Sequence, residues 1–175
     1  MKHIINEPFT KEKLAVLRTG DTVLLTGTIY CARDAAHKRL VEMLGRGEQL
    51  PLELADAAIY YAGPTPAKPG YPAGSAGPTT SYRMDPFAPA LMEQGVSVMI
   101  GKGPRGPEVN KSIEDTGAVY LAAIGGAAAL IAQCIRASEV VAFGELGTEA
   151  VRKLYVEQMP LVVAHDCHGG DIYHK

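Results

Sequence analysis

The sequence has no tryptophan and only three cysteines, Cys31, Cys134 and Cys167, spread widely over its 175 residues. No pair of them forms a Cys-x-x-Cys motif. An odd and widely spaced set does not supply a disulfide framework or a zinc ribbon. Three cysteines are enough in number to hold a metal cluster, but nothing in their spacing favours one. We therefore interpret them as small thiols that are buried or half-buried.

An excess of charge of one sign is also missing, because 17 Lys and Arg residues face 19 Asp and Glu residues, for a net charge of -2. So balanced a chain gives no reason to expect nucleic acid or an anionic membrane as a partner. The first residues lack the apolar core of a signal peptide, so we expect a cytoplasmic protein.

Long apolar runs are scarce as well. The longest uncharged stretch, residues 117–135, approaches the roughly 20 residues of a membrane span. It consists mostly of Ala and Gly, however, and Gly125-Gly126 divides it. We predict a buried strand followed by a buried helix instead.

Apolar runs alternate with helical patterns along a chain that is 47% hydrophobic and 21% charged. The predicted strands are residues 22–30, 57–61, 96–100, 118–123, 140–143 and 161–164. The predicted helices are residues 10–17, 34–44, 85–94, 108–115, 127–136 and 149–156. This alternation predicts an α/β fold with a largely parallel sheet. No internal linker is visible, so we expect residues 1–175 to form a single domain.

Residues 62–80 contain five prolines and four glycines, and so long an irregular segment in a compact domain is usually functional. It ends in Gly77-Pro-Thr-Thr-Ser-Tyr-Arg83. Thr79 and Arg83 are four residues apart, so one helical turn would place both on one side, where they suit a carboxylate. The alternative is that Thr79 and Thr80 cap the following helix while Arg83 is solvated.

Arg33 and His37 are also four residues apart, at the start of the predicted helix 34–44. A helix N-terminus favours anions, and an arginine there would add to the effect. His37 has an unperturbed pKa near neutrality and is a candidate general base. The alternative is a surface arginine beside Asp34 and a half-buried histidine.

The segment Gly101-Lys-Gly-Pro-Arg-Gly106 formally matches the Gly-x-Gly-x-x-Gly motif of nucleotide sites. Two prolines interrupt the helix that should receive the pyrophosphate, so a loop that brings Lys102 to an anion suits the residues better. The alternative is a plain turn with Lys102 in solvent. Gly125-Gly126 is expected to permit close packing at a strand–helix corner, with a possible anion site at the helix N-terminus.

Three histidines, His165, His168 and His174, cluster near Asp166 and Asp171. Their spacing matches no known metal site, and we predict no metal ligands in this chain.

Arg33, Arg83 and Lys102, together with a threonine hydroxyl, suit a small dianion such as a dicarboxylate. They do not name a reaction, because they supply neither a metal nor a clear nucleophile–base pair.

The sequence resembles the β region of the class I, iron–sulfur-dependent fumarate hydratases, a family that includes the β subunit of L-tartrate dehydratase. The resemblance covers nearly the whole chain in the same order. It rests on Gly27-Thr-Ile-Tyr-Cys-Ala-Arg-Asp-Ala-Ala-His-Lys-Arg39, Tyr61-Ala-Gly-Pro-Thr-Pro, Gly77-Pro-Thr-Thr-Ser-Tyr-Arg-Met-Asp85, Ile100-Gly-Lys-Gly103, Ala123-Ile-Gly-Gly-Ala-Ala127 and Glu145-Leu-Gly-Thr-Glu-Ala150.

The resemblance implies a hydro-lyase of the tricarboxylic acid cycle that hydrates fumarate reversibly to L-malate. It implies a [4Fe-4S] cluster held by three cysteines of an α subunit, with one iron open to substrate as a Lewis acid. It further implies an α2β2-type assembly and a three-layer β/β/α swivelling domain.

Residue by residue, the resemblance assigns the catalytic base to Thr79 and substrate binding to Arg33, Arg83 and Lys102. His37, Thr80 and Gly101 take supporting positions, and the catalytic acid belongs to the α subunit. Cys31 departs from the threonine expected at its position. Ala-Ile-Gly-Gly-Ala-Ala and Arg-Met-Asp favour fumarate over tartrate as substrate. A nucleotide-binding module and a non-catalytic interaction module remain as alternatives.

Overall fold

The structure is a computed structural model that describes residues 1–123 and 128–174, with only the backbone of residues 128 and 129. In these residues seven strands form one mixed sheet. They are β1 (Lys2–Asn6), β2 (Thr22–Cys31), β3 (Ala58–Tyr60), β4 (Val98–Gly101), β5 (Val119–Ala122), β6 (Ile135–Ala142) and β7 (Val151–His165). Successive strands from β1 to β5 pair in parallel, whereas β6 and β7 run antiparallel to their neighbours.

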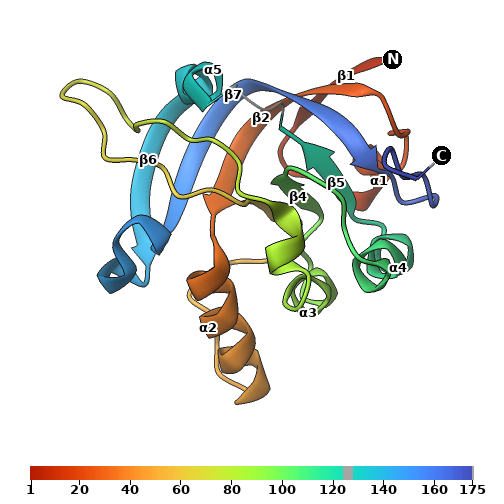
Figure 1. Cartoon of the computed structure of the whole chain (residues 1–175), viewed down its shortest axis with the longest axis horizontal. Coiled ribbons are helices and arrows are strands. Elements are labelled where there is room, and N and C mark those ends of the chain that lie inside the picture. The colour runs from red at the N-terminus through yellow and green to blue at the C-terminus, as the bar shows by residue number, and fades with distance from the viewer. Residues whose placement is uncertain (124–127, 175) are drawn as a thin grey trace.

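The long strand β7 closes the sheet into a barrel. One edge of β7 pairs with β2, and the opposite edge pairs with β6 along its first half and with β5 along its second. The ring β2–β3–β4–β5–β7 is therefore a closed barrel of five strands, flanked by β1 and β6 (Figure 1).

Strand β2 also has two neighbours along one edge, because β1 pairs with its first half and β3 with its end. The change from β1 to β3 comes after Leu25 and Gly27, between which the register of β2 against β7 shifts. Gly27 has a φ of 146°, and an ideal Cβ on it would lie 2.8 Å from Cβ of Glu7. Only glycine fits this bend without strain.

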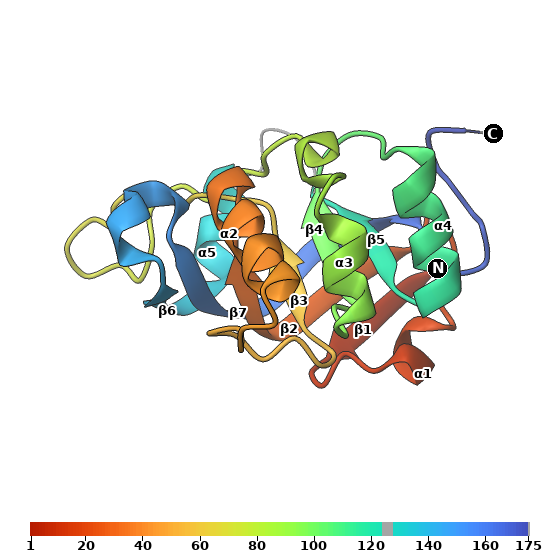
Figure 2. The ribbon, with the colours of Figure 1, turned by 90° about the horizontal axis from the view of Figure 1, so that it is seen from below.

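The helices lie mainly on one side of the barrel. Figure 2 shows α2, α3 and α4 side by side on this face, and α5 lies on the opposite side in Figure 1. The helical segments are α1 (Lys11–Leu14), α2 (Asp34–Gly45), η1 (Ser81–Met84), α3 (Ala88–Glu93), α4 (Pro107–Thr116), α5 (Ala128–Cys134) and η2 (Gly144–Glu149).

Two hydrophobic cores lie on the two faces of the barrel wall. The inner core takes alternate residues from the strands, such as Leu25, Tyr60 and Leu154. The outer core joins the intervening residues, such as Ile59, to helix residues that include Leu40 and Leu91. The period of two along each strand thus supplies both cores at once.

The mixed α/β fold is confirmed. Strands and helices occur at or close to most of the predicted positions up to residue 134, and residues 62–80 contain no helix or strand. A largely parallel sheet describes β1 to β5 and does not describe β6 and β7. The closed ring of five strands was not predicted.

Two predictions near the C-terminal end of the chain need correction. The helix predicted for residues 149–156 is wrong, because the chain continues there as the first half of β7. The strand predicted for residues 161–164 is only the end of that 15-residue element. No element was predicted for β1.

The uncharged stretch 117–135 contains the predicted strand and helix as β5 and α5, while Gly125-Gly126 lies outside the described residues. Strand β5 is buried as predicted, but α5 is not a buried helix, because Leu130 is 53% exposed and Ile131 is the buried side chain among residues 130–134. Within the part that is described, no helix is both long and apolar enough to cross a membrane. Cys31 is buried, Cys134 and Cys167 are half-buried, and all three are free thiols.

Candidate active site

The predicted threonine and lysine segments lie next to each other at the end of β4. Thr80 and Lys102 form a parallel β-bridge, and the Ser81 amide donates a hydrogen bond to the Lys102 carbonyl oxygen at 2.9 Å. The Thr79 amide donates to the carbonyl oxygen of Tyr61, just beyond β3, at 2.6 Å. The hydroxyl-bearing segment is therefore held by the backbone against the ends of two parallel strands.

Gly101 is required by this close approach. An ideal Cβ on Gly101 would lie 1.9 Å from Oγ of Ser81 and 2.8 Å from Cδ2 of Tyr61. The hydroxyl of Tyr120 is hydrogen-bonded to Oγ of Ser81 at 2.7 Å and to the Gly103 carbonyl oxygen at 2.8 Å. The glycine thus lets a buried serine sit between the two segments.

Arg83 is joined to the start of α2. Its Nε and Nη2 atoms each lie 2.9 Å from Oδ2 of Asp34, with 45% of the Arg83 side chain exposed. Thr80 precedes η1, but its side chain makes no capping hydrogen bond. The alternative of a threonine cap with a freely solvated Arg83 therefore does not describe this segment.

Arg33 lies directly before α2 in an extended conformation. Its Nε atom is buried and has no hydrogen-bond partner among the residues that the structure describes. Its Cδ atom would be 3.1 Å from a Cβ on Gly63, so the side chain passes close to the backbone that follows β3. Arg33 thus follows the end of β2 and Lys102 the end of β4, while Thr79 is hydrogen-bonded to the residue that follows β3. This arrangement is in keeping with ligand binding at the carboxyl ends of parallel strands.

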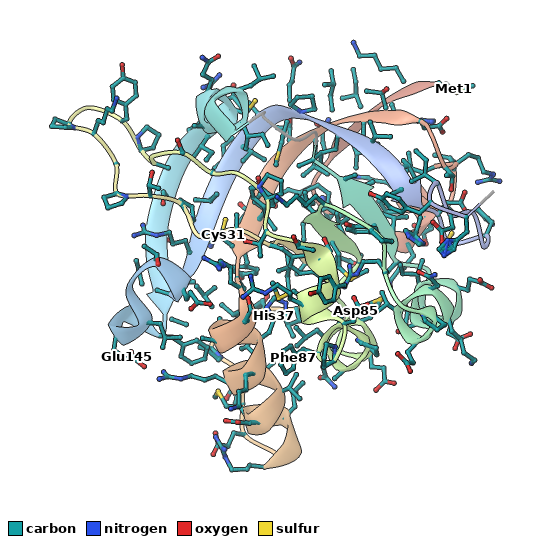
Figure 3. The ribbon with its side chains drawn as sticks, viewed as in Figure 1. Met1, Cys31, His37, Asp85, Phe87 and Glu145 are labelled. Carbon is teal, nitrogen blue, oxygen red and sulfur yellow. The ribbon has the colours of Figure 1, made fainter. Side chains whose placement is uncertain are left out.

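His37 is completely buried between α2 and the barrel (Figure 3). Its Nδ1 lies 2.8 Å from the carbonyl oxygen of Arg33, and its ring packs edge-on against Tyr61 with centroids 5.4 Å apart. Burial lowers the pKa of His37 to about 4. Because a carbonyl oxygen only accepts, the neutral ring carries its proton on Nδ1. Nε2 is then buried and has no partner within the described part of the chain.

Sequence reasoning missed an ion pair between these segments, in which the buried Arg105 binds the half-buried Asp85. Nε of Arg105 donates to Oδ1 of Asp85 at 2.7 Å, and the Gly106 amide donates to Oδ2 at 2.6 Å. Asp85 belongs to the motif that ends the irregular segment, and Arg105 belongs to the formal nucleotide motif. Nothing in either motif indicates that the two side chains meet.

The hydrogen bond from the Gly106 amide to Asp85 also bears on the alternative that this chain is a nucleotide-binding module. Gly106 is the N-cap of α4, and its amide is occupied by the Asp85 carboxylate. A pyrophosphate would need this helix N-terminus, so the geometry disfavours a dinucleotide site.

The C-terminal histidines are only partly brought together. Nε2 of His165 lies 3.3 Å from Oδ1 of Asp171, and Nδ1 of His174 lies 3.7 Å from Oδ2 of the same residue. His168 instead contacts the Ala15 carbonyl oxygen. Over residues 1–123 and 128–174, no group of three His, Cys, Asp or Glu side chains has the geometry of a metal site.

Comparison with known proteins places this geometry in context. Residues 2–175 match the family described as Fumarase C-terminus. The chain is 42% identical over 176 residues to "Fumarate hydratase class I, anaerobic" of Escherichia coli (strain K12), with 98% of this chain and 32% of that protein aligned. It is 40% identical to "Fumarate hydratase 2" of Leishmania major, with 94% of this chain and 29% of that protein aligned.

A relative of similar length is "Putative L(+)-tartrate dehydratase subunit beta" of Methanocaldococcus jannaschii. It is 42% identical over 181 residues, with 100% of this chain and 92% of that protein aligned. The chain therefore spans about a third of the length of the fumarate hydratases and nearly the whole length of this subunit.

Proposed function

Because the chain belongs to the fumarase C-terminus family, we propose that it is the β subunit of a hydro-lyase that hydrates fumarate reversibly to L-malate. The observation that carries the proposal is the meeting of the segments around Thr79 and Lys102, which the Thr80–Lys102 bridge holds together. The names and the 42% identity of the fumarate hydratase and tartrate dehydratase relatives support the reaction class.

The substrate in this proposal is a small dicarboxylate. Arg33 and Arg83 have planar forks that suit carboxylates, and Lys102 adds a compact positive charge. Lys102 is exposed. The buried and unpaired Nε of Arg33 is a donor that a ligand carboxylate would satisfy.

Thr79 is the proposed base that exchanges a proton with the substrate carbon. A threonine hydroxyl is a weak base in water, so the neighbouring cations must stabilise its deprotonated form. Thr80 and Gly101 support it, because the bridge and the close approach at Gly101 fix the backbone next to Thr79.

His37 has a supporting role in this proposal. It is buried, neutral and hydrogen-bonded to the Arg33 carbonyl, so it orients Arg33. Its lack of exposure argues against direct proton exchange with a substrate.

The [4Fe-4S] cluster of the proposal belongs to a partner, because the cysteines of this chain do not fit it. Cys31 lies inside the barrel, where burial raises the pKa of its thiol to about 12. Three cysteines that hold one cluster must converge on one site, and over residues 1–123 and 128–174 Cys31, Cys134 and Cys167 form no such group. A cluster-bearing α subunit would correspond to the part of the longer relatives that is not aligned to this chain.

The remaining expectations form part of the same proposal. They are a single domain over residues 1–175, an α2β2-type assembly, a cytoplasmic location and a role in the tricarboxylic acid cycle. A closed barrel with helices on one face can be described as two strand layers and one helix layer. In that sense we retain the three-layer β/β/α swivelling domain.

The test is turnover of fumarate by this chain reconstituted with its α subunit. We expect the chain alone to be inactive and colourless. Thr79→Ala should lower kcat of the complex by about 100-fold or more, in the range of lost general acid–base catalysis. Arg83→Ala should mainly raise KM. The control is Thr116→Ala, because the Thr116 hydroxyl bonds only to the Ser112 carbonyl within α4.

Fumarate turnover by the purified, metal-free chain would contradict the assignment of the cluster to a separate α subunit. Full activity of the Thr79→Ala complex would contradict the assignment of the base.

The second candidate is the β subunit of an L(+)-tartrate dehydratase. It is favoured by the relative with that name, of which 92% is aligned to this chain. An added hydroxyl is weakly discriminated by some pockets, so the pocket type alone does not decide between the substrates. Comparing kcat/KM for L-malate and L(+)-tartrate with the same complex would separate the two candidates.

A further inference from the structure

Arg105 is a buried cation in the loop between β4 and α4, three residues after Lys102. None of its side chain is exposed. Besides Asp85, it reaches the Tyr61 hydroxyl with Nη2 at 3.2 Å. Its guanidinium carbon lies 5.1 Å from the ring centroid of Tyr61 and 4.8 Å from that of Tyr120. The charge is therefore compensated by one carboxylate and two aromatic faces.

Stability alone gives little reason for such a pair. Replacing a buried ion pair with apolar groups of similar volume is often neutral or stabilising. A buried pair is better explained by a geometry that it imposes. The two ends of the pair are attached to the two segments of the candidate site.

Asp85 directly follows η1, the segment that begins after Thr79 and Thr80. Arg105, three residues after Lys102, and Gly106 directly precede α4. One carboxylate thus binds the side chain of Arg105 and the backbone of Gly106, and joins the two segments. We call this arrangement the Asp85–Arg105 clamp.

The clamp acts together with two other connections between these segments. The Ser81 amide bonds to the Lys102 carbonyl oxygen, and the Tyr120 hydroxyl bonds to both Ser81 and the Gly103 carbonyl oxygen. The clamp is the connection at the far end of the loop 101–106, where Arg105 and Gly106 meet Asp85. With this end fixed as well, the loop has little freedom to shift relative to residues 79–83, and the separation between Thr79 and Lys102 is set.

We infer that Asp85 and Arg105 are positioning residues, which set the separation between the proposed base Thr79 and the proposed substrate-binding Lys102. The inference rests on the proposed function. Neither residue is required to touch the substrate.

The experiment compares the reconstituted wild-type complex with Arg105→Lys, Asp85→Asn and the double variant. Lysine keeps the charge but cannot contact Asp85 and Tyr61 with one planar fork. A displacement of about 1 Å costs on the order of 100-fold in rate, so we expect kcat for L-malate to fall by about that factor. Because Arg33 and Arg83 still bind the substrate, KM should change by less than about threefold.

Two further readouts separate positioning from folding. With L-malate deuterated at C3, a misplaced base slows proton transfer, so the isotope effect on kcat should rise above that of the wild type. A partly unfolded variant would lose rate without a change in the isotope effect. The double variant should lose no more than the worse single variant, because both changes open the same clamp.

The matched control is Arg46→Lys, since Arg46 pairs only with Glu48 on the surface and should leave kcat and the isotope effect unchanged. Wild-type kcat in Arg105→Lys, or a lowered kcat with an unchanged isotope effect, would overturn the inference alone. A wild-type complex inactive toward fumarate, L-malate and tartrate would overturn the proposed function and, with it, this inference.

Discussion

His37 is a histidine whose environment changes its protonation near neutral and mildly acidic pH. It is fully buried, and burial lowers its pKa from 6.5 to about 4, against the opposing effect of the hydrogen bond to the Arg33 carbonyl. In the unfolded chain the same ring would titrate near its ordinary value. Between these two pH values the unfolded state binds a proton that the folded state does not bind.

We therefore predict that the free energy of unfolding falls as the pH is lowered from about 6.5 to about 4. Each pH unit of this window costs about 1.4 kcal/mol per proton, so His37 alone accounts for on the order of 3 kcal/mol. Urea titrations at several pH values measure the slope. The variant His37→Asn keeps an N–H donor for the Arg33 carbonyl and should flatten the slope.

The matched control is the exposed His168, and His168→Asn should retain the wild-type slope. An unchanged slope in His37→Asn would show that other groups cause the acid sensitivity.

At the scale of single residues, only part of the site could be predicted from the sequence. Sequence position after buried strands was enough to select Arg33, Thr79, Arg83 and Lys102 as candidates. It could not show that Arg83 pairs with Asp34, because that contact joins segments 49 residues apart. The clamp was missed for the same reason, since a buried arginine and a surface arginine look alike in a sequence.

Between elements, the contact of β4 with η1 leaves no room for a side chain at Gly101. Gly101→Ala would bring the new methyl group to 1.9 Å from Oγ of Ser81 and 2.8 Å from Tyr61. Overpacking a filled interior typically costs about 1–3 kcal/mol. We predict a lower melting temperature together with a loss of activity in the reconstituted complex.

The control for this change is Gly45→Ala at the end of α2, where a Cβ would meet nothing within 4 Å. Alanine is the better helix former, so this variant should be neutral or slightly more stable. Adding Ser81→Gly to Gly101→Ala removes the closest contact and should restore part of the stability. If Gly101→Ala melted like Gly45→Ala, η1 would have to be looser than its contacts indicate.

Elements were predictable where local pattern and tertiary role agree. Strand β2 alternates fully buried residues with more accessible ones along its whole length, and α2 has an apolar face. The first half of β7 contains Glu, Arg, Lys and Leu, which favour a helix. It is a strand because β2 and β6 pair with it on both sides, and this pairing overrides local propensity.

At the scale of the whole molecule, the two cores share one barrel wall. Ile59 of β3 packs in the outer core, and the next residue, Tyr60, packs in the inner core. Neither core persists if the strands separate. The closure by β7 adds to this dependence, because β7 pairs with both β2 and β5. Barrel and helices should therefore unfold together.

The prediction is a single unfolding transition that either core can shift. Leu25→Ala in the inner core and Leu91→Ala in the outer core each remove a buried leucine, which typically costs about 2–5 kcal/mol.

Circular dichroism should follow the helices and strands. Tyrosine fluorescence should follow packing, because the chain has eight tyrosines and no tryptophan. Both probes should give the same denaturant midpoint in each variant. If Leu91→Ala instead melted the helices before the tyrosine signal changed, the barrel would be stable without its outer core, and the shared wall would not make the molecule cooperative.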